Sequence, residues 1–278
     1  MLKLMYITNN PEIAKIAEDA GVDRIFVDLE YIGKSERQGG MDTVQSHHTI
    51  EDIKEIKKTL TRAEVFVRCN PIHEMTSKYG SSQKEIEAII QAGADVVMLP
   101  YFKTIGDVRR FVELVDGRVK TSLLVETPEA VKIIDEVLDV SGIDEVHIGL
   151  NDLSLGYGKK FMFELLVDGT VENLCLKFKQ KGIPYGFGGI ATLDEGMIPA
   201  KYIIREHYRL GSTCAILSRS FCNVNKIEQM DIIRTIFEEG LKEIRNFEAE
   251  CESMEQDYAE NSRIIVERIK FVCSNIKS

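Results

Sequence analysis

Eight short apolar segments recur along the chain, and longer segments with the apolar spacing of amphipathic helices separate them. Continuous apolar runs of this length are typical of parallel strands that are buried on both faces. Their alternation with helices predicts a parallel sheet, and eight such units close a (β/α)8 barrel. An open doubly wound sheet is the alternative, but no G-x-G-x-x-G follows the first strand. The expected strands are Leu2–Thr8, Arg24–Glu30, Glu64–Asn70, Asp95–Pro100, Lys120–Glu126, Glu145–Leu150, Pro184–Ile190 and Thr213–Arg219.

Capping residues mark two of the expected helix starts. Thr49 precedes Asp52 by three residues, and Ser81 or Ser82 precedes Glu85, which predicts two capped helix starts.

Residues 1–225 are expected to form the barrel, and residues 226–278 to form closing and C-terminal helices of the same domain. The last amphipathic segment has no obvious place in a barrel. It would cap the barrel bottom or dock on a neighbouring subunit, and a homo-oligomer is expected.

Charge and apolar content exclude several partners. The net charge of −10 argues against nucleic acid and against an anionic membrane surface. No apolar run approaches the ~20 residues that a membrane-spanning helix needs, and the N-terminal residues lack a signal-peptide core. Cys69 and Cys214 fall in predicted strands, where free buried thiols are more plausible than disulfides or zinc ligands. These features favour a cytoplasmic protein.

Glu126 and Asp152 end two successive apolar runs, and they lie one strand–helix–strand unit apart. Side chains at the carboxyl ends of barrel strands form the ligand-binding face of this fold. Adjacent parallel strands are about 4.8 Å apart, so both carboxylates can reach one hard cation. The pair therefore predicts a divalent metal site. The alternative is that each carboxylate only caps the helix that follows it.

Other charged residues are expected at the same face. Asp28 and Glu30 end the second strand, and Arg68 ends the third. Arg68 would bind an anionic substrate or would only pair with Asp28 or Glu30. Arg219 ends the eighth strand, and with the glycine-rich turn 186–189 it would bind a distal anion of the substrate. The competing account of Arg219 is an ion pair with Asp28 or Glu30.

Several of these segments together resemble the HpcH/HpaI aldolase and citrate lyase family. They are PEIAKIAEDAGVDRIFVDLE, VRCNP, GADVVMLP, LLVETPEAV and IGLNDLSLGYG, which span residues 11–160 in order. The resemblance implies a (β/α)8 barrel in which Glu126 and Asp152 bind Mg²⁺ or Mn²⁺. It also implies that Arg68 contacts a 2-oxo acid and steadies the enolate oxygen, and we expect Leu150 and Asn151 to contact the substrate beside Asp152.

The chain departs from the family pattern at one position. Pyruvate aldolases of the family read D-x-E-H at the second strand, whereas this chain has Tyr31 in place of that histidine. Asp28 and His48 are the remaining candidates for catalysis beside Arg68. His47 and His48 precede the Thr49 cap, and either one would move over the site or would remain an exposed turn residue.

The expected function is a metal-dependent lyase. It would cleave or form 4-hydroxy-2-oxo acids, with a 2-oxo acid and an aldehyde as the small-molecule partners. A second possibility is a citrate-lyase-like enzyme for a 3-hydroxyacyl thioester, for which basic residues must surround the barrel mouth. The candidates for that role are Lys34, Arg37, Lys159, Lys160 and Arg219. A third possibility is a catalytically silent relative that only binds the oxo acid.

Overall fold

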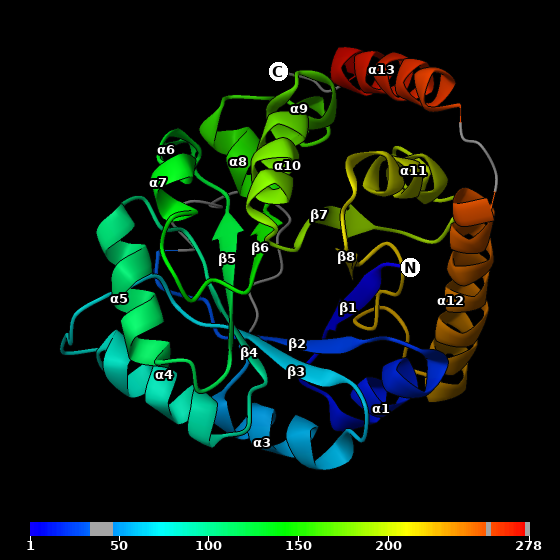
Figure 1. Cartoon of the computed structure of the whole chain (residues 1–278). Coiled ribbons are helices and arrows are strands. Elements are labelled where there is room, and N and C mark those ends of the chain that lie inside the picture. The colour runs from blue at the N-terminus through cyan, green and yellow to red at the C-terminus, as the bar shows by residue number, and fades with distance from the viewer. Residues whose placement is uncertain (34–46, 254–256, 276–278) are drawn as a thin grey trace.

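The structure is a computed structural model, and it describes residues 1–33, 47–253 and 257–275. Eight parallel strands in these residues form a closed barrel, and helices surround it (Figure 1). Each predicted strand is found, with its ends within two residues of those expected. The strands are β1 (Lys3–Ile7), β2 (Arg24–Asp28), β3 (Glu64–Arg68), β4 (Val96–Leu99), β5 (Lys120–Val125), β6 (Glu145–Ile148), β7 (Tyr185–Ile190) and β8 (Cys214–Leu217).

The barrel closes where β8 pairs with β1, with Leu4 opposite Ala215 and Tyr6 opposite Leu217. The other strands pair with their neighbours in chain order. The open doubly wound sheet is thereby excluded, because such a sheet keeps two unpaired edges. Since all the strands are parallel, their carboxyl ends meet at one face of the barrel, which is called the top here.

Helix starts follow the predicted chemistry in one case and only partly in another. Thr49 and Asp52 form a complete capping box at the start of α3. Ser81 is the N-cap residue of α4, but its side chain makes no capping hydrogen bond. The helices are α1 (Pro11–Ala20), α3 (Ile50–Thr59), α4 (Ser82–Gln91), α5 (Ile105–Val115), α6 (Pro128–Lys132), α7 (Ile134–Val137), α8 (Leu150–Gly156), α9 (Glu164–Val167), α10 (Thr170–Lys181), α11 (Ala200–Leu210), α12 (Met230–Ser253) and α13 (Tyr258–Asn275).

The barrel interior has an apolar middle with an arginine at each end. Its middle is formed by Met5, Phe26, Phe66, Val96, Met98, Leu124 and Cys214. Below it, Arg24 is 1% exposed and donates through Nε to Glu64 and through both terminal nitrogens to Glu145, on the opposite strand β6. Above it, Arg68 lies over the Phe26 ring, 5.6 Å from the centroid. Arg24 and its carboxylate partners therefore fill the bottom of the interior, whereas the charged groups at the top lie at the candidate site.

A buried carboxylate on α1 holds the segment that leads into β3. Glu18 is fully buried, and its Oε1 accepts hydrogen bonds from the backbone N–H groups of Thr61, Arg62 and Ala63, at 2.8, 2.6 and 2.8 Å. Burial raises the pKa of the Glu18 carboxyl, but these hydrogen bonds and the Lys15 ammonium outweigh burial and bring the pKa to about 2.

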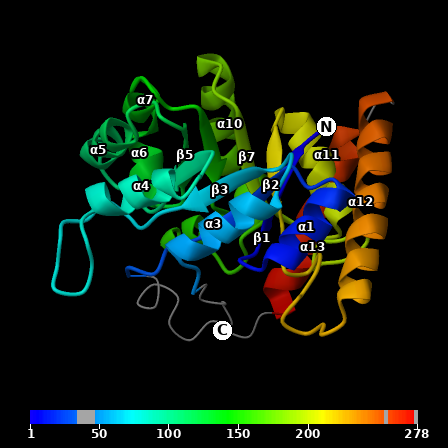
Figure 2. The ribbon, with the colours of Figure 1, turned by 90° about the horizontal axis from the view of Figure 1, so that it is seen from below.

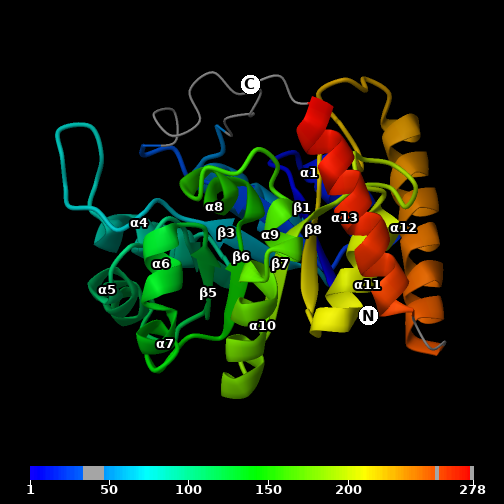
Figure 3. The ribbon, with the colours of Figure 1, turned by 90° about the horizontal axis from the view of Figure 1, so that it is seen from above.

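The two C-terminal helices lie on the outer wall of the barrel. Helix α12 packs against α1 (Figure 2), and α13 packs against α11 and α9 (Figure 3). Asn261 of α13 donates to the Tyr202 carbonyl and to Glu206 of α11 at 3.1 and 2.9 Å. The prediction that the last helix caps the barrel bottom is therefore wrong. None of the helices in the described ranges is both long and apolar enough to cross a membrane.

Candidate active site

Glu126 follows β5 directly and is held by backbone contacts. Its Oε1 accepts a hydrogen bond from the Tyr101 N–H at 2.9 Å. The N-cap of α6 is its neighbour Thr127, whose hydroxyl accepts from the Ala130 N–H, so the alternative that Glu126 is a helix cap is wrong. Gly149 lies so close that a Cβ there would come within 2.8 Å of the Glu126 Cβ. The residue at 149 must therefore be glycine for Glu126 to keep this position.

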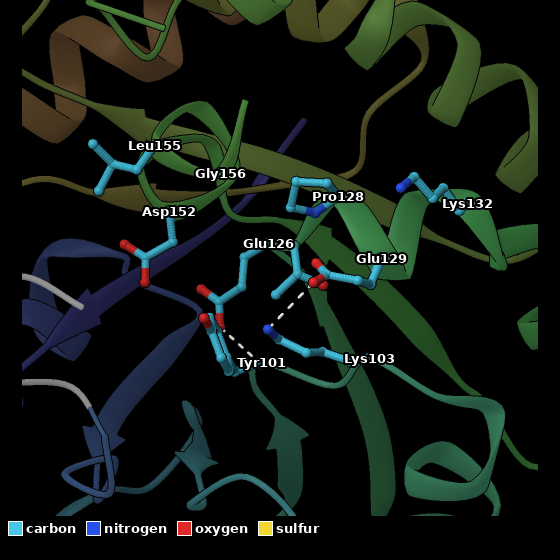
Figure 4. Close-up of a pocket in the computed structure, with 10 residues that line it drawn as sticks. Tyr101, Lys103, Glu126, Pro128, Glu129, Lys132, Asp152, Leu155 and Gly156 are labelled. Carbon is cyan, nitrogen blue, oxygen red and sulfur yellow. Dashed lines mark hydrogen bonds and ion pairs between the residues drawn. The ribbon is translucent and has the colours of Figure 1, made fainter. Parts of the chain in front are cut away.

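Asp152 lies in the first turn of the short helix α8, whose N-cap is Gly149. The capping alternative is therefore wrong for Asp152 too. Asn151 donates from Nδ2 to Asp152 Oδ1 at 3.0 Å, and Leu150 is buried. The carboxylates of Glu126 and Asp152 point into the same space (Figure 4). The structure thus brings together the two residues that the sequence singled out.

Arg68 forms a bidentate pair with Asp28, through Nε and one terminal nitrogen at 2.8 Å each. Its other terminal nitrogen lies 3.4 Å from Glu30. The pairing that the sequence offered as an alternative role is thus present. It does not exclude substrate binding, because Arg68 also lines a cavity at the top of the barrel and the pair with Asp28 fixes its orientation.

This inner cavity has a volume of about 280 Å³ and collects most of the predicted site residues. Arg68, Glu126 and Asp152 supply its charged groups. Leu150 and Asn151 also line it, as expected of substrate contacts. Its remaining wall consists of Phe26, Met98, Leu124, His147, Ile148, Gly149, Met162, Gly188, Gly189, Ile216 and Ser218. A small polar molecule held here would have a mainly apolar surrounding with a few charged contacts, which is typical of ligand sites.

The charged groups of the cavity affect one another's pKa values. Burial raises the pKa of the Glu126 carboxyl well above its usual range, the charges of Glu30 and Asp152 add to this, and Arg68 opposes it. For Arg68, burial lowers the pKa, but Asp28 and Glu30 outweigh burial and raise it well above its usual value. Arg68 is therefore a permanent cation, whereas Glu126 needs a further positive charge nearby to remain ionised.

His48 lies beside the site, and its contact restricts its chemistry. Its Nδ1 accepts a hydrogen bond from the Asp28 backbone N–H at 3.0 Å. A neutral imidazole has one protonated nitrogen, so the ring carries its hydrogen on Nε2. His48 in this position is a hydrogen-bond donor through Nε2. His47 is exposed.

His147, in β6, is buried. Burial lowers the pKa of its imidazole to about 4, so the ring is neutral. Its Nε2 lies 3.4 Å from the Gly188 carbonyl oxygen, and its Nδ1 lies 3.8 Å from the Cys214 Sγ. Because His147 also lines the inner cavity, its ring belongs both to the core and to the wall of the site.

Arg219 is exposed at the top of β8, and its neighbour Ser218 lines the inner cavity instead. Gly188 and Gly189, which the structure places in β7 and not in a turn, line the same cavity. The residues that line the cavity at the end of β8 are therefore Ile216 and Ser218, and not Arg219. The role of Arg219 in binding a distal anion stays a prediction.

The residues that the sequence analysis missed lie in the loop after β4. Tyr101 has a left-handed backbone, with φ of 49°, and its N–H holds Glu126. Tyr101 and Lys103 line a second, outer cavity of about 420 Å³ that also reaches Glu126 and Asp152 (Figure 4). No local sequence pattern predicts a tyrosine with a left-handed backbone conformation, because non-glycine residues seldom adopt it.

The sequence of the barrel matches a family model. The model of the HpcH/HpaI aldolase/citrate lyase family matches residues 3–166, more than half of the chain and the part that contains Arg68, Glu126 and Asp152. The chain belongs to this family. Membership in the HpcH/HpaI family makes the protein an aldolase- or lyase-like enzyme in broad class. No curated protein matches the chain.

Solved structures of HpcH/HpaI proteins share the barrel. An HpcH/HpaI aldolase from Desulfitobacterium hafniense is 19% identical, with a TM-score of 0.60 over 88% of this chain and 93% of its own. An HpcH/HpaI aldolase/citrate lyase family protein from Burkholderia cenocepacia is 15% identical, with a TM-score of 0.62 over 84% and 94%. The citrate synthase SbnG is 15% identical, with a TM-score of 0.57 over 77% and 84%. At such identities the likeness concerns the fold.

Proposed function

We propose that the protein is a divalent-metal-dependent carbon–carbon lyase that cleaves or forms 4-hydroxy-2-oxo acids through a pyruvate-type enolate. One observation carries the proposal. Two carboxylates, Glu126 and Asp152, and one oriented guanidinium, Arg68, line the same small cavity at the carboxyl ends of the barrel strands. Membership in the HpcH/HpaI family supports the same class of reaction.

The donor set suits a hard divalent cation. Glu126 and Asp152 offer carboxylate oxygens, and a cation between them would offset the burial that raises the pKa of Glu126. In the part of the chain that the structure describes, no group of three or more His, Cys, Asp and Glu side chains is placed to hold a metal. Mg²⁺ is commonly bound by one or two carboxylates together with water and substrate oxygens, so two protein ligands are sufficient. When bound, Mg²⁺ or Mn²⁺ would supply Lewis-acid polarisation of the oxo-acid carbonyl.

The protein's own residues divide the remaining tasks. Arg68, oriented by Asp28, donates N–H groups to the carboxylate of the oxo acid and to the oxygen that becomes negative in the enolate. Asp28 acts as a positioning residue through that pair. His48, whose Nδ1 accepts from the Asp28 backbone N–H, is the further candidate for a catalytic role beside Arg68. Leu150 and Asn151 form the wall beside Asp152 and limit the room around the reacting carbon.

The reaction that follows is a reversible aldol cleavage. The hydroxyl proton of the 4-hydroxy-2-oxo acid passes to solvent as the bond between carbons 3 and 4 breaks, and the electron pair of that bond passes into the enolate. The aldehyde leaves, and the enolate takes up a proton at carbon 3 to give the 2-oxo acid. In the reverse direction the enolate carbon attacks the aldehyde carbonyl. The enolate forms in both directions, and Arg68 stabilises it in both. The positive charge of Arg68 does not depend on pH in the neutral range.

The metal site is tested with Glu126→Gln. We expect Mn²⁺ affinity, measured by isothermal titration, to fall at least about 100-fold, since even residues behind the direct ligands are often worth about 10- to 100-fold. The fold should persist, because a neutral amide resembles the protonated carboxyl that burial favours here. Glu136→Gln is the control, since Glu136 is exposed on α7. Unchanged Mn²⁺ affinity in Glu126→Gln would refute the assignment.

The citrate-lyase-like alternative and the binding-only alternative are separated by substrate. Lys34 and Arg37, two of the basic residues expected for a CoA thioester, lie outside the described residues, and Lys159 is paired with Asp168 at 2.8 Å. Turnover is therefore to be measured with both hydroxy-oxo acids and hydroxyacyl thioesters. Binding of pyruvate with no exchange of its methyl protons and no turnover of either substrate class would support the binding-only alternative.

A further inference from the structure

Asn70, just beyond the end of β3, is a buried polar residue that the reaction proposed above does not use. It is 1% exposed. Its Oδ1 accepts hydrogen bonds from the backbone N–H groups of Tyr31 and Ile32, at 3.0 and 2.9 Å. Its Nδ2 donates to the Leu29 carbonyl at 3.2 Å. One side chain at the end of β3 therefore holds the backbone that follows β2, on both sides of Glu30.

Glu30 is the residue that this backbone brings to the site. Its N–H donates to Asp28 Oδ1 at 3.2 Å, and its carboxylate lies 3.4 Å from a terminal nitrogen of Arg68. The N–H of Leu29 still donates to the Arg68 carbonyl, as in a sheet, but Glu30 lies beyond that contact. Asp28 is therefore fixed by its place in β2, whereas the position of Glu30 depends on the side chain of Asn70.

Asn70 is itself anchored by Glu85, in the first turn of α4. Glu85 Oε1 accepts from the Asn70 backbone N–H at 3.0 Å and from Asn70 Nδ2 at 2.8 Å. If the amide were turned over, its oxygen would face two acceptors and its nitrogen would face the N–H groups of Tyr31 and Ile32. The hydrogen bonds therefore specify one orientation of the Asn70 amide.

A second buried asparagine allows the structural part of this role to be separated from the rest. Asn261, in α13, is also 1% exposed, and its Nδ2 also donates to a carbonyl and to a glutamate, those of Tyr202 and Glu206, at 3.1 and 2.9 Å. Asn261 Oδ1 has no hydrogen-bond partner among the residues that the structure describes. The two amides make matching donor contacts, and Asn70 differs by accepting two hydrogen bonds from backbone beside the site.

We propose that Asn70 is a positioning residue for Arg68. It fixes residues 29–32, so that the Glu30 carboxylate stays against the guanidinium and the guanidinium keeps the orientation in which it meets the enolate. Such a role has a large effect on rate, because a displacement of about 1 Å at a catalytic group can cost about 100-fold. The enolate step rests on the proposed function, whereas the hold on Arg68 is a property of the folded chain alone.

The kinetic test compares Asn70→Ala with Asn261→Ala in the exchange of pyruvate methyl protons with Mg²⁺ present. In Asn70→Ala, kcat is expected to fall about tenfold or more while KM for pyruvate changes by less than about threefold. The charge of Arg68 stays in the cavity and still attracts the oxo acid, but its fit to the enolate is lost. In Asn261→Ala, both constants should equal those of the parent.

An exchange of groups between positions 70 and 85 provides a rescue. In Asn70→Asp, two carboxylates face each other and kcat should fall as in Asn70→Ala. Adding Glu85→Gln restores a hydrogen bond between the two side chains, with donor and acceptor interchanged, and leaves an oxygen at position 70 to accept from the backbone after β2. The double variant should therefore recover most of the lost kcat. A double variant no better than Asn70→Asp would contradict the role of the amide.

A spectroscopic measurement separates this inference from the proposed function. The Arg68 Nε–H, which donates to a carboxylate, gives a ¹⁵N-edited NMR signal that is identified by its loss in Arg68→Lys. In Asn70→Ala, its hydrogen exchange with water should become about tenfold faster, while that of the Arg24 Nε–H at the other end of the barrel keeps its rate. An unchanged rate at Arg68 overturns the inference, as does an equal kcat of the two alanine variants when the parent exchanges pyruvate protons. If the Arg68 signal responds as expected and the parent shows no such exchange, the hold on Arg68 stands and the proposed lyase activity fails.

Discussion

Arg24, which is buried, and Arg68, whose side chain is 15% exposed, lie at opposite ends of the barrel interior in similar surroundings. Arg24 is paired with Glu64 and Glu145 and lies over the Phe66 ring, and Arg68 is paired with Asp28 and Glu30 and lies over the Phe26 ring. Only Arg68 lines the inner cavity. A comparison of the two arginines therefore separates the structural contribution of a guanidinium in the barrel interior from its contribution to the reaction.

Arg68→Lys should depress the exchange of pyruvate methyl protons, followed by NMR, by about 100-fold or more, because an ammonium cannot reproduce the planar fork. Its free energy of unfolding should fall by roughly 1–3 kcal/mol, since the carboxylates lose part of their pairing. Arg24→Lys is the matched control, in which a similar loss of stability should leave the exchange rate of the folded protein unchanged. Equal losses of exchange in both variants would assign Arg68 a structural role alone.

At the residue scale, position along a strand was the informative signal. Glu126, Asp152 and Arg68 could be predicted because each terminates an apolar run, and parallel strands bring those ends together. The hydrogen bond that holds Glu126 could not be predicted, because its donor is the backbone of Tyr101, and any residue has that group. Lys103 was missed for a related reason, since a surface lysine has no pattern that distinguishes it from others.

At the scale of elements, helix α1 is tied to the start of β3 by one carboxylate. Glu18→Gln should lower the free energy of unfolding by about 2 kcal/mol in urea titrations at pH 7, because the three backbone N–H groups lose a charged acceptor. Asp19→Asn is the control on the same helix, since Asp19 also pairs with Lys15 but is exposed, and it should change stability by less than about 0.5 kcal/mol.

The pH dependence of this contribution has a defined sign. The pKa of Glu18 is lowered to about 2 in the folded chain, below the ordinary value of 4.5, so its stabilisation is present above pH 4.5 and is lost as the pH falls toward 2. Glu18→Gln should therefore show a flatter decline of stability in that range than the parent protein. An identical decline in both would contradict the role of the carboxylate charge.

Elements also differ in how well their sequences predict their positions. The eight strands were predictable because both of their faces are buried, which leaves apolar runs in the sequence. The last helix was recognised by its amphipathic pattern, but its place was not, because an apolar stripe specifies burial and does not name the surface that covers it. Helix α13 uses Asn261 to bind α11, and such a contact is visible only once the two helices are side by side.

At the scale of the whole molecule, two buried neutral histidines set the stability in mild acid. Burial lowers the pKa of His147 to about 4. Burial also lowers the pKa of His207 to about 3, and the nearby His147 contributes a smaller part of that shift. The unfolded chain therefore binds more protons than the folded chain as the pH falls below 6.5, so stability decreases toward pH 4. Each histidine should account for about 2 kcal/mol between pH 7.5 and pH 5.

The measurement compares the parent protein with His207→Leu by urea unfolding at pH 7.5 and pH 5. His207 stacks on Phe187 with the ring centres 3.9 Å apart, so an apolar side chain suits the space. The variant should lose about 2 kcal/mol less than the parent over this range. Glu126 acts in the opposite direction, since its raised pKa favours the folded state as pH falls, but it is common to both proteins and cancels. Parallel pH curves for the two proteins would contradict the prediction.

The ion pairs of Arg24 also have a consequence for the order in which the molecule is completed. The ribosome synthesises Arg24 before both of its partners: Glu64 follows 40 residues later, and Glu145 follows 121 residues later. Until β6 emerges, the guanidinium lacks its bidentate partner from across the barrel and must remain hydrated. We therefore expect the interior of the nascent N-terminal half to stay hydrated around Arg24 until translation has passed residue 145, before β8 is made and the barrel can close.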